Sequence, residues 1–316
     1  MLKLKALLLT QGMHGMISQT EGLAKALSLN FAHHTVKLKS FWNIVPPKIT
    51  PISENLLTEK IICDSKIIIS CGRKSVISSI ALKKRFKNNI FNIHIQNPKV
   101  SLEHFDLVIC PDHDKIQGEN VLKTTGAIHY LTKKEINKNY NFLKTKRNEK
   151  KIVSFIIGGP NKYYNYSEKE IDIVFNKVKN SFPTNKYKIV VIPSYRTPEN
   201  VIKKALISFG LNHEVIRIVD KNAYLESLKI ADIIIVTCDS TSMISEAAVT
   251  GKPIYVAHMQ AIKNNYRFKK FYTQFKKLGI IRDLNDSIDI WSYNQLDEVN
   301  RIAPIIKAKM KLNGII

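Results

Sequence analysis

Short runs of apolar residues alternate along the chain with longer stretches in which apolar positions recur every three or four residues. The short runs are typical of strands buried on both faces of a parallel sheet, and the longer period is typical of helices with one buried face. In the first half we expect strands at 4–10, 67–70, 90–95 and 107–110, and helices at 18–29 and 75–87. In the second half we expect strands at 152–157, 189–192, 215–219, 233–236 and 254–256, and helices at 167–182, 198–209, 223–230 and 240–250. This alternation predicts an α/β protein built from repeated βαβ units.

The stretch 131–151 is polar, lysine-rich and weakly periodic, and it separates two regions that each resemble a doubly wound half. We therefore expect two Rossmann-like domains, 1–148 and 149–316, with the last helix free to pack back on the N-terminal domain. Domains of this kind facing each other would place a cleft at the carboxyl ends of both sheets.

The charge balance points first to anionic partners. The 316 residues carry 49 basic and 26 acidic side chains, a formal charge of +23. Only eight of the basic residues are arginines, the side chain that suits base readout and bidentate phosphate binding. We interpret most lysines as solvated surface, with some attraction to an anionic membrane. Nucleic-acid binding is not expected, because no aromatic platform or recognised binding motif accompanies the charge.

Cysteine usage and hydropathy predict a cytoplasmic protein. The four cysteines, Cys63, Cys71, Cys110 and Cys238, form no CxxC pair and lie in or beside apolar runs, so we expect buried, reduced thiols. No apolar stretch is as long as a transmembrane helix, and the N-terminus lacks the pattern of a secretory signal or a mitochondrial transit peptide.

A first candidate loop, TQGMHG at residues 10–15, lies between the first strand and the first helix. Gly12 and Gly15 permit a tight turn and close approach of a ligand to the backbone. The motif lacks the third glycine of a dinucleotide site and the lysine of a P-loop, so a plain turn remains an alternative. His14 is a candidate base, and an exposed loop histidine is the competing interpretation.

A second candidate, at residues 236–247, joins a buried strand to a helix whose first turn is rich in hydroxyl groups. Such a helix start can hold phosphate through free backbone N–H groups, with Asp239, Ser240 and Ser242 nearby. Ordinary N-capping by Asp239 or Ser240 is the alternative. Glu246 lies too deep in the helix for a capping box and could accept hydrogen bonds from ribose hydroxyls.

A third candidate combines Gly158 and Gly159 with the loop that contains Ser194 and Arg196. Both segments follow strands of the same half, so in a parallel sheet they share an edge with Ser240. A loop flanked by two prolines would hold the Arg196 guanidinium for a pyrophosphate. Each segment alone is also a plausible turn, but their coincidence at strand ends indicates a ligand site.

Two further motifs favour structural roles. The CPDHD sequence at 110–114 has no recognised metal spacing, so a structural loop is favoured over a metal site, and His129 is interpreted as a hinge residue. The stretch 267–279 has an aromatic face and a lysine face. A helix there could lie on an anionic membrane, but docking of its aromatic face into the core is the favoured interpretation.

Eight motifs are spread over most of the chain: GMHGMISQTEGL (12–23), GR (72–73), FDLVICPDHD (105–114), GAIH (126–129), GGP (158–160), RTP (196–198), TCDSTSMISEAAVTGKPIYV (237–256) and WSY (291–293). Together they resemble the motifs of the mitochondrial fission family named for elongated mitochondria, in its bacterial form. That family is similar to glycosyltransferases of the two-Rossmann-domain GT-B type. Many bacterial relatives read DGKxGH in the first loop, whereas this chain has Gln11, Met13 and Met16 at the corresponding positions.

The resemblance implies a metal-independent GT-B glycosyltransferase without a cofactor, using a nucleotide-diphosphate sugar as donor. By the family pattern, Gly158, Arg196, Ser240, Ser242 and Glu246 correspond to donor-binding positions. The resemblance does not identify the acceptor that the N-terminal domain would hold, and a lipid-linked or envelope glycan is one candidate. The family's association in plants with recruiting a dynamin-related protein implies an alternative, a non-catalytic adaptor at a membrane that retains the fold.

Overall fold

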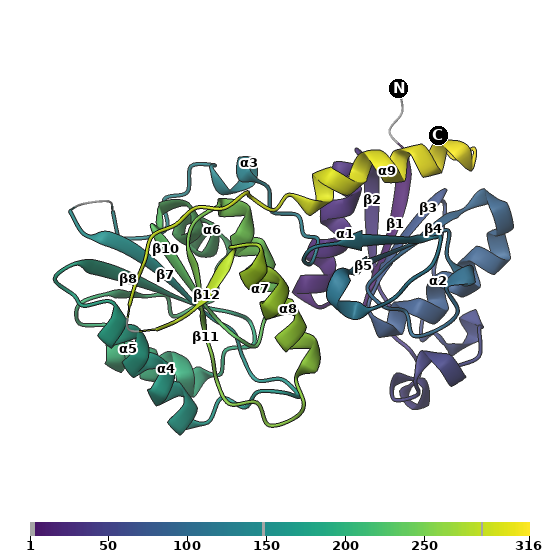
Figure 1. Ribbon diagram of the computed structural model, residues 1–316. Helices are drawn as coiled ribbons and strands as arrows, with labels where there is room; N and C mark the ends of the chain where they lie inside the picture. The colour runs from purple at the N-terminus through teal and green to yellow at the C-terminus, as the bar shows by residue number, and fades with distance from the viewer. Residues whose placement is uncertain (1–3, 147–148, 286) are drawn as a thin grey trace. The chain divides into compact units, whose positions relative to one another are not determined.

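The computed structural model describes residues 4–146, 149–285 and 287–316. Over this range the chain forms two compact units (Figure 1). Unit 1 runs to Leu131 and also includes Asp297–Ile316, and unit 2 is Thr132–Leu296. Each unit contains a parallel sheet with helices packed against it, so the prediction of an α/β protein with two Rossmann-like domains is confirmed.

Unit 1 is built on a six-stranded parallel sheet with the strand order β2-β1-β3-β4-β5-β6 over its described residues. The strands are β1 (Lys5–Thr10), β2 (Asn30–Thr35), β3 (Ile67–Cys71), β4 (Phe91–Ile95), β5 (Leu107–Pro111) and β6 (Val121–Thr124). The main helices are α1 (His14–Ala26), α2 (Arg73–Phe86) and α9 (Glu298–Leu312). Core side chains of α1 and α9 pack on one face of the sheet, and those of α2 and the β2–β3 connection pack on the other.

Unit 2 has a second six-stranded parallel sheet, with the order β12-β11-β10-β7-β8-β9 in the residues described. Its strands are β7 (Lys151–Ile157), β8 (Tyr187–Pro193), β9 (Glu214–Val215), β10 (Ile233–Thr237), β11 (Ile254–Ala257) and β12 (Ile281–Asp283). Its helices are α3 (Lys133–Ile136), α4 (Glu168–Ser181), α5 (Glu199–Phe209), α6 (Lys221–Ile230), α7 (Thr241–Ala247) and α8 (Tyr266–Lys277). Read from the opposite edge, this is the 3-2-1-4-5-6 strand order of the dinucleotide-binding Rossmann fold.

The polar stretch before β7 belongs to unit 2, so the division lies at 131/132 and not at the expected 148/149. Two carboxylates hold this stretch. Glu226 accepts hydrogen bonds from the backbone N–H groups of 142 and 143, at 2.6 and 2.9 Å. Glu214 accepts from those of 144 and 145, at 2.9 and 2.7 Å. Composition alone did not predict that this stretch belongs to unit 2, because the two carboxylates that hold it lie in α6 and β9, far away in the sequence.

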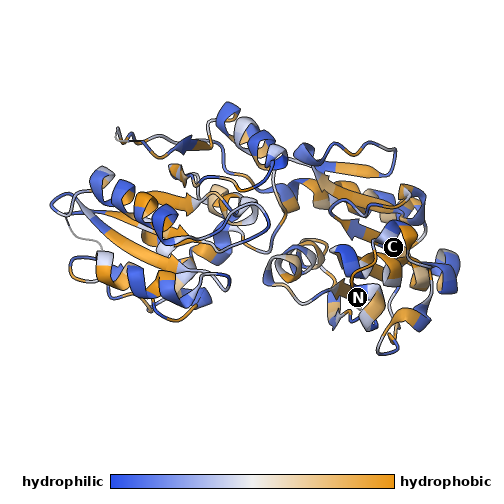
Figure 2. Ribbon diagram, turned by 90° about the horizontal axis from the view of Figure 1, so that it is seen from below, coloured by the Kyte–Doolittle hydropathy of each residue, from blue (hydrophilic) through white to orange (hydrophobic). Residues whose placement is uncertain are grey.

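The burial pattern follows the hydropathy of the elements. Most strands are almost entirely apolar, and the helices have apolar and polar faces (Figure 2). The main exception is β2, NFAHHT, which is half-exposed because it is an edge strand that pairs only with β1. Its polar composition explains why hydropathy did not predict it. Among the described helices, none is both long enough and apolar enough to cross a membrane.

Candidate functional site

In each unit, two of the motifs singled out from the sequence lie at the topological switch point of the sheet, where ligands of open α/β folds bind. In unit 2 the switch point falls between β7 and β10. Gly158 follows β7 and Asp239 follows β10, and the Arg196 loop follows the neighbouring strand β8. In unit 1 the switch point falls between β1 and β3, which the Gly12 loop and Gly72 follow.

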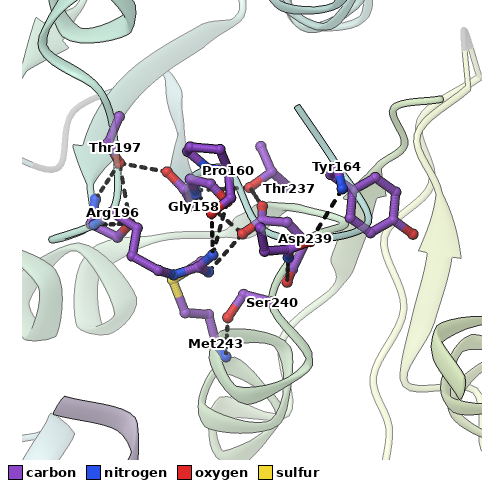
Figure 3. Close-up of polar contacts among 12 residues, drawn as sticks. Gly158, Pro160, Tyr164, Arg196, Thr197, Thr237, Asp239, Ser240 and Met243 are labelled. Carbon is purple, nitrogen blue, oxygen red and sulfur yellow. Dashed lines mark hydrogen bonds and ion pairs between the residues drawn. The ribbon is translucent and has the colours of Figure 1, made fainter. Parts of the chain in front are cut away.

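The Asp239 carboxylate is at the centre of a hydrogen-bond network in unit 2 (Figure 3). Its side chain is fully buried, with 0% exposed. Oδ1 accepts from the Tyr166 hydroxyl at 2.5 Å and from Thr237 Oγ1 at 2.7 Å. Oδ2 accepts from Arg196 Nη2 at 2.7 Å and from the Gly159 backbone N–H at 3.1 Å. With two donors on each oxygen, this carboxylate is satisfied by protein groups and organises the strand ends around it.

The two glycines after β7 are required by this packing. A Cβ atom at Gly158 would lie 2.3 Å from Asp239 Oδ2, and one at Gly159 would lie 2.0 Å from the Arg196 carbonyl oxygen. Their N–H groups are also used within the protein, because Gly158 N donates to Thr237 Oγ1 at 2.8 Å and Gly159 N donates to Asp239. The β8 and β10 loops therefore fill the Cβ positions of both glycines and pair with their N–H groups.

The loop after β8 positions Arg196 by local hydrogen bonds. Ser194 Oγ accepts from the Arg196 backbone N–H at 3.3 Å, and Thr197 Oγ1 donates to the Gly158 carbonyl at 2.6 Å. The Arg196 guanidinium also donates through Nη1 to the Gly159 carbonyl at 2.8 Å (Figure 3). Its side chain keeps 36% of its surface exposed. The arginine is therefore rigidly oriented, and its charge is balanced by Asp239.

Helix α7 begins with Ser240 as its N-cap, whose Oγ accepts from the Met243 backbone N–H at 3.3 Å. The capping interpretation thus describes this hydroxyl group. Ser242 and Glu246 are four residues apart on α7 and share a face of the helix. The backbone N–H groups of Thr241 and Ser242 lie in the first turn, where a helix offers no internal acceptor.

Glu246 is the titratable group of this helix with a perturbed pKa. Burial raises the pKa of its carboxyl to about 7, partly offset by a hydrogen bond that Oε2 accepts from the Tyr224 hydroxyl at 2.9 Å. Tyr224 lies on α6 and was not singled out from the sequence, because its relation to Glu246 depends on how α6 and α7 pack. The pair forms a carboxyl group poised near neutral pH, a feature of binding and catalytic sites.

In unit 1 the first loop differs from the glycine loop of unit 2. Gly12 has φ +84°, and its N–H donates to Thr10 Oγ1 at 3.0 Å, so this glycine is needed for the turn itself. A Cβ atom at Gly15 would meet nothing within 4 Å. His14 is exposed at the start of α1. Gly12, His14 and Gly15 thus lie at one strand end in unit 1, whereas the other predicted site residues all lie in unit 2.

A cluster of side-chain amides near the same edge of unit 1, with Gln19 buried and Gln11 and Gln96 half-buried, was not predicted. Gln96 follows β4 with φ +84°, and its Nε2 donates to Gln19 Oε1 at 3.4 Å. Gln19 Nε2 donates in turn to the Gly15 carbonyl at 3.0 Å, and Gln11 Oε1 accepts from the Lys74 backbone N–H at 3.3 Å. The positive φ of Gln96 has no sequence signal, since glycine or asparagine is the usual residue there.

The remaining motifs have structural explanations. Cys71, Cys110 and Cys238 are buried and Cys63 is half-buried, and none of these four is in a disulfide. Within the described ranges, no group of three or more His, Cys, Asp or Glu side chains could hold a metal ion. In α8, Phe271, Tyr272 and Phe275 are buried, so the core-docking interpretation of this helix is confirmed. The backbone of His129 packs against Gly22 of α1, two residues before the division between the units.

Comparison with protein families finds one matching model, described as Mitochondrial fission ELM1, over residues 14–310. A Rickettsia prowazekii protein named Uncharacterized protein RP120 is 30% identical, with 78% of this chain and 80% of that protein covered. The Arabidopsis thaliana mitochondrial fission protein ELM1 is 26% identical, with 78% of this chain and 64% of that protein covered.

Solved structures share the fold at low sequence identity. MnaA of S. aureus, in a co-structure with UDP, has a TM-score of 0.55 at 15% identity, with 98% of this chain and 90% of that chain covered. UDP-GlcNAc 2-epimerase of Neisseria meningitidis, bound to UDP-GlcNAc, has a TM-score of 0.53 at 13% identity, covering 98% and 100%. MurG of Acinetobacter baumannii has a TM-score of 0.51 at 10% identity, covering 99% and 93%. These likenesses establish the fold as GT-B.

Proposed function

The chain belongs to the mitochondrial fission ELM1 family, and from this membership and its GT-B fold we propose that it is a GT-B-type glycosyltransferase with a nucleotide-diphosphate sugar as donor. Unit 2 would bind the donor and unit 1 the acceptor. The observation that carries the proposal is the gathering of a rigidly held arginine and the start of α7 at the switch point of unit 2.

Arg196 would bind the diphosphate through directed N–H groups and not through net charge. Asp239 balances its charge, but the ion pair and the bond to Gly159 fix the guanidinium while part of it stays exposed. Because its N–H groups are already oriented, the guanidinium needs no rearrangement as negative charge develops on the leaving diphosphate. The first-turn N–H groups of Thr241 and Ser242 would add to this stabilisation, so the proposed reaction would need no metal ion.

Glu246 would accept hydrogen bonds from the ribose hydroxyls of the donor. Its Oε2 is oriented by Tyr224, and Ser242 lies one turn before it on the same face of α7. With a pKa of about 7, this carboxyl is ionised above pH 7, and the ionised form accepts hydrogen bonds better than the neutral form. The affinity for the nucleotide-sugar donor should therefore rise as the pH increases through 7.

On the acceptor side, the open space at Gly15 and the exposed His14 support a site at the first turn of α1. His14 would remove the proton from an acceptor hydroxyl as general base. Gly12 would set the turn that presents it. The acceptor class proposed is a lipid-linked or envelope glycan, which fits a protein working in the cytoplasm at the inner face of a membrane.

Isothermal titration against UDP-, CMP- and GDP-sugars tests the proposal. One donor class should bind, and Arg196→Lys and Glu246→Gln should each weaken binding about tenfold, as expected for loss of one good hydrogen bond to a charged group. Arg282→Lys and Glu199→Gln, which alter exposed ion pairs in the same unit, serve as matched controls and should leave affinity unchanged. Absence of binding by every donor would refute the enzyme proposal.

A second candidate is a non-catalytic adaptor that keeps the fold. It is favoured by the Asp239 network, because the glycine N–H groups and part of the arginine are already used within the protein. Cellular complementation separates the two functions. An adaptor should keep its phenotype with Arg196→Ala and Glu246→Ala, whereas an enzyme should lose it.

A further inference from the structure

Three large apolar side chains are exposed within nine residues of unit 1. Phe41 is 64% exposed, Ile44 is 75% exposed and Ile49 is 70% exposed. They belong to the long connection between β2 and β3, which forms short 3-10 turns at Ser40–Asn43, Pro47–Ile49 and Glu54–Leu56. In Figure 1 this connection lies at the end of unit 1 opposite α9. We call residues 41–49 the apolar turn.

The apolar turn is anchored to unit 1, so its side chains project from a fixed backbone. Trp42 packs against the core under α2, in edge-to-face contact with Phe41 at a ring-centroid distance of 4.9 Å. Asn43 Nδ2 donates to the Leu38 carbonyl at 2.9 Å, and the Arg73 guanidinium donates to the Asn43 carbonyl. The exposure of Phe41 and Ile44 is thus built into the fold.

The surroundings of the apolar turn are positively charged. Lys37, Lys39 and Lys48 are exposed, and no aspartate or glutamate occurs between residues 22 and 53. The next acid, Glu54, is paired with Arg85 at 3.2 Å. Exposed aromatic and aliphatic side chains with exposed lysines close by in the chain match an anionic membrane surface, in which negatively charged headgroups lie over an apolar interior.

We propose that the apolar turn is a membrane-docking site that inserts Phe41, Ile44 and Ile49 into the interfacial region of an anionic phospholipid bilayer. Lysine suits this role because its compact charge attracts diffuse headgroups without directed pairing. The site replaces α8, whose aromatic face is buried in unit 2, as the membrane-binding candidate. It does not depend on the proposed transferase activity, and it would hold unit 1 against the bilayer in either candidate function.

Co-sedimentation with vesicles tests the proposal directly. The protein should bind vesicles of phosphatidylcholine and phosphatidylglycerol, and bind pure phosphatidylcholine much more weakly. Phe41→Ser with Ile44→Ser should weaken binding roughly a hundredfold, because each buried apolar side chain contributes on the order of tenfold. Ile207→Ser with Leu211→Ser, which changes two equally exposed apolar residues of unit 2, is the matched control and should not alter binding.

The charge contribution is tested separately. Replacing Lys37, Lys39 and Lys48 by glutamine should lower affinity roughly a hundredfold, since each lysine near the surface contributes about a factor of five. The same change at Lys169, Lys177 and Lys179, exposed lysines of unit 2, lowers the total charge equally and should have a much smaller effect.

Tryptophan fluorescence gives a readout of depth. The chain has two tryptophans, so Trp291→Phe leaves Trp42 as the reporter beside Phe41. Brominated lipids should quench it in anionic vesicles. The proposal is overturned if the wild-type protein does not bind anionic vesicles, or if the serine variant binds them as tightly while its thermal melt is unchanged. Loss of self-association in the serine variant, without vesicle binding by the wild type, would instead identify a protein interface and overturn it equally.

Discussion

Replacing Asp239 by asparagine should destabilise unit 2 strongly while preserving the shape of the side chain. An amide has one acceptor oxygen, so its NH₂ group faces either Arg196 and Gly159, which can only donate, or the Tyr166 and Thr237 hydroxyls, which can accept from it but lose the acceptor for their own hydrogens. Two donors then lose their acceptor, at about 1–3 kcal/mol each. The ion pair is lost as well, but Arg196 keeps 36% of its surface exposed, so this loss costs less than the about 3–5 kcal/mol of a fully buried pair. We therefore expect a loss of roughly 2–4 kcal/mol.

Urea unfolding followed by Trp291 fluorescence measures this loss in unit 2. Trp291 packs edge-to-face on Tyr255 of β11, and Trp42→Phe removes the other tryptophan. The matched control is Asp172→Asn, which breaks an exposed ion pair to Lys204 and should cost at most about 1 kcal/mol. If Asp239→Asn is as stable as this control, the buried network does not stabilise the strand ends and the structural role assigned to it is wrong.

Two further predictions concern the glycines and Glu246. Gly159→Ala should destabilise unit 2 by several kcal/mol in chemical unfolding, because its Cβ would collide with the Arg196 carbonyl. Gly15→Ala should be neutral or stabilise unit 1 by up to about 1 kcal/mol, since its Cβ would meet nothing within 4 Å and alanine favours the helix. Equal losses in the two variants would contradict the close packing assigned to Gly159. The pKa of Glu246 is about 7 in the folded state against an ordinary value of 4.5, so folding favours the neutral carboxyl. The contribution of this carboxyl to the free energy of unfolding is therefore complete below pH 4.5 and is lost as the pH rises through 7. Glu246→Gln should therefore gain stability over the wild type by up to about 3 kcal/mol between pH 4.5 and 7, as measured by unfolding at several pH values, and a constant difference would show that the carboxyl is not perturbed.

The apolar strands were predictable because a strand buried on both faces leaves a continuous hydrophobic signal. Edge strands leave no such continuous signal, so β2 was not predicted. The two-residue strand β9 was predicted at 215–219 but lies at Glu214–Val215. Positions at strand ends were equally predictable, because parallel topology places their carboxyl ends on one edge. Gly158, Arg196 and Asp239 do meet there in unit 2.

The direction in which these groups point was not predictable from the sequence. A glycine beside a strand end gives the same sequence signal whether its backbone approaches a phosphate or a neighbouring loop. At Gly158 and Gly159 the collision distances show that the neighbouring loops already require glycine. Likewise, an arginine between two prolines indicates an anion-binding side chain as long as the carboxylate that pairs with it is not known. Asp239 lies 43 residues away in sequence, and only the pairing of β7 with β10 and β8 brings the two together.

The return of α9 to unit 1 sets the order in which the chain can fold during synthesis. Ile302, Ile306 and Met310 of α9 are part of the core beneath α1, and Glu298 accepts a hydrogen bond from the Thr125 backbone N–H at 2.7 Å. The N-terminal residues are synthesised first, yet the core of unit 1 is complete only when α9, which follows unit 2 in the sequence, has been made. Unit 2, which is continuous in sequence, can close earlier. Until α9 packs, the nascent unit 1 exposes the apolar surface that α9 covers, and exposed surface of this kind favours aggregation.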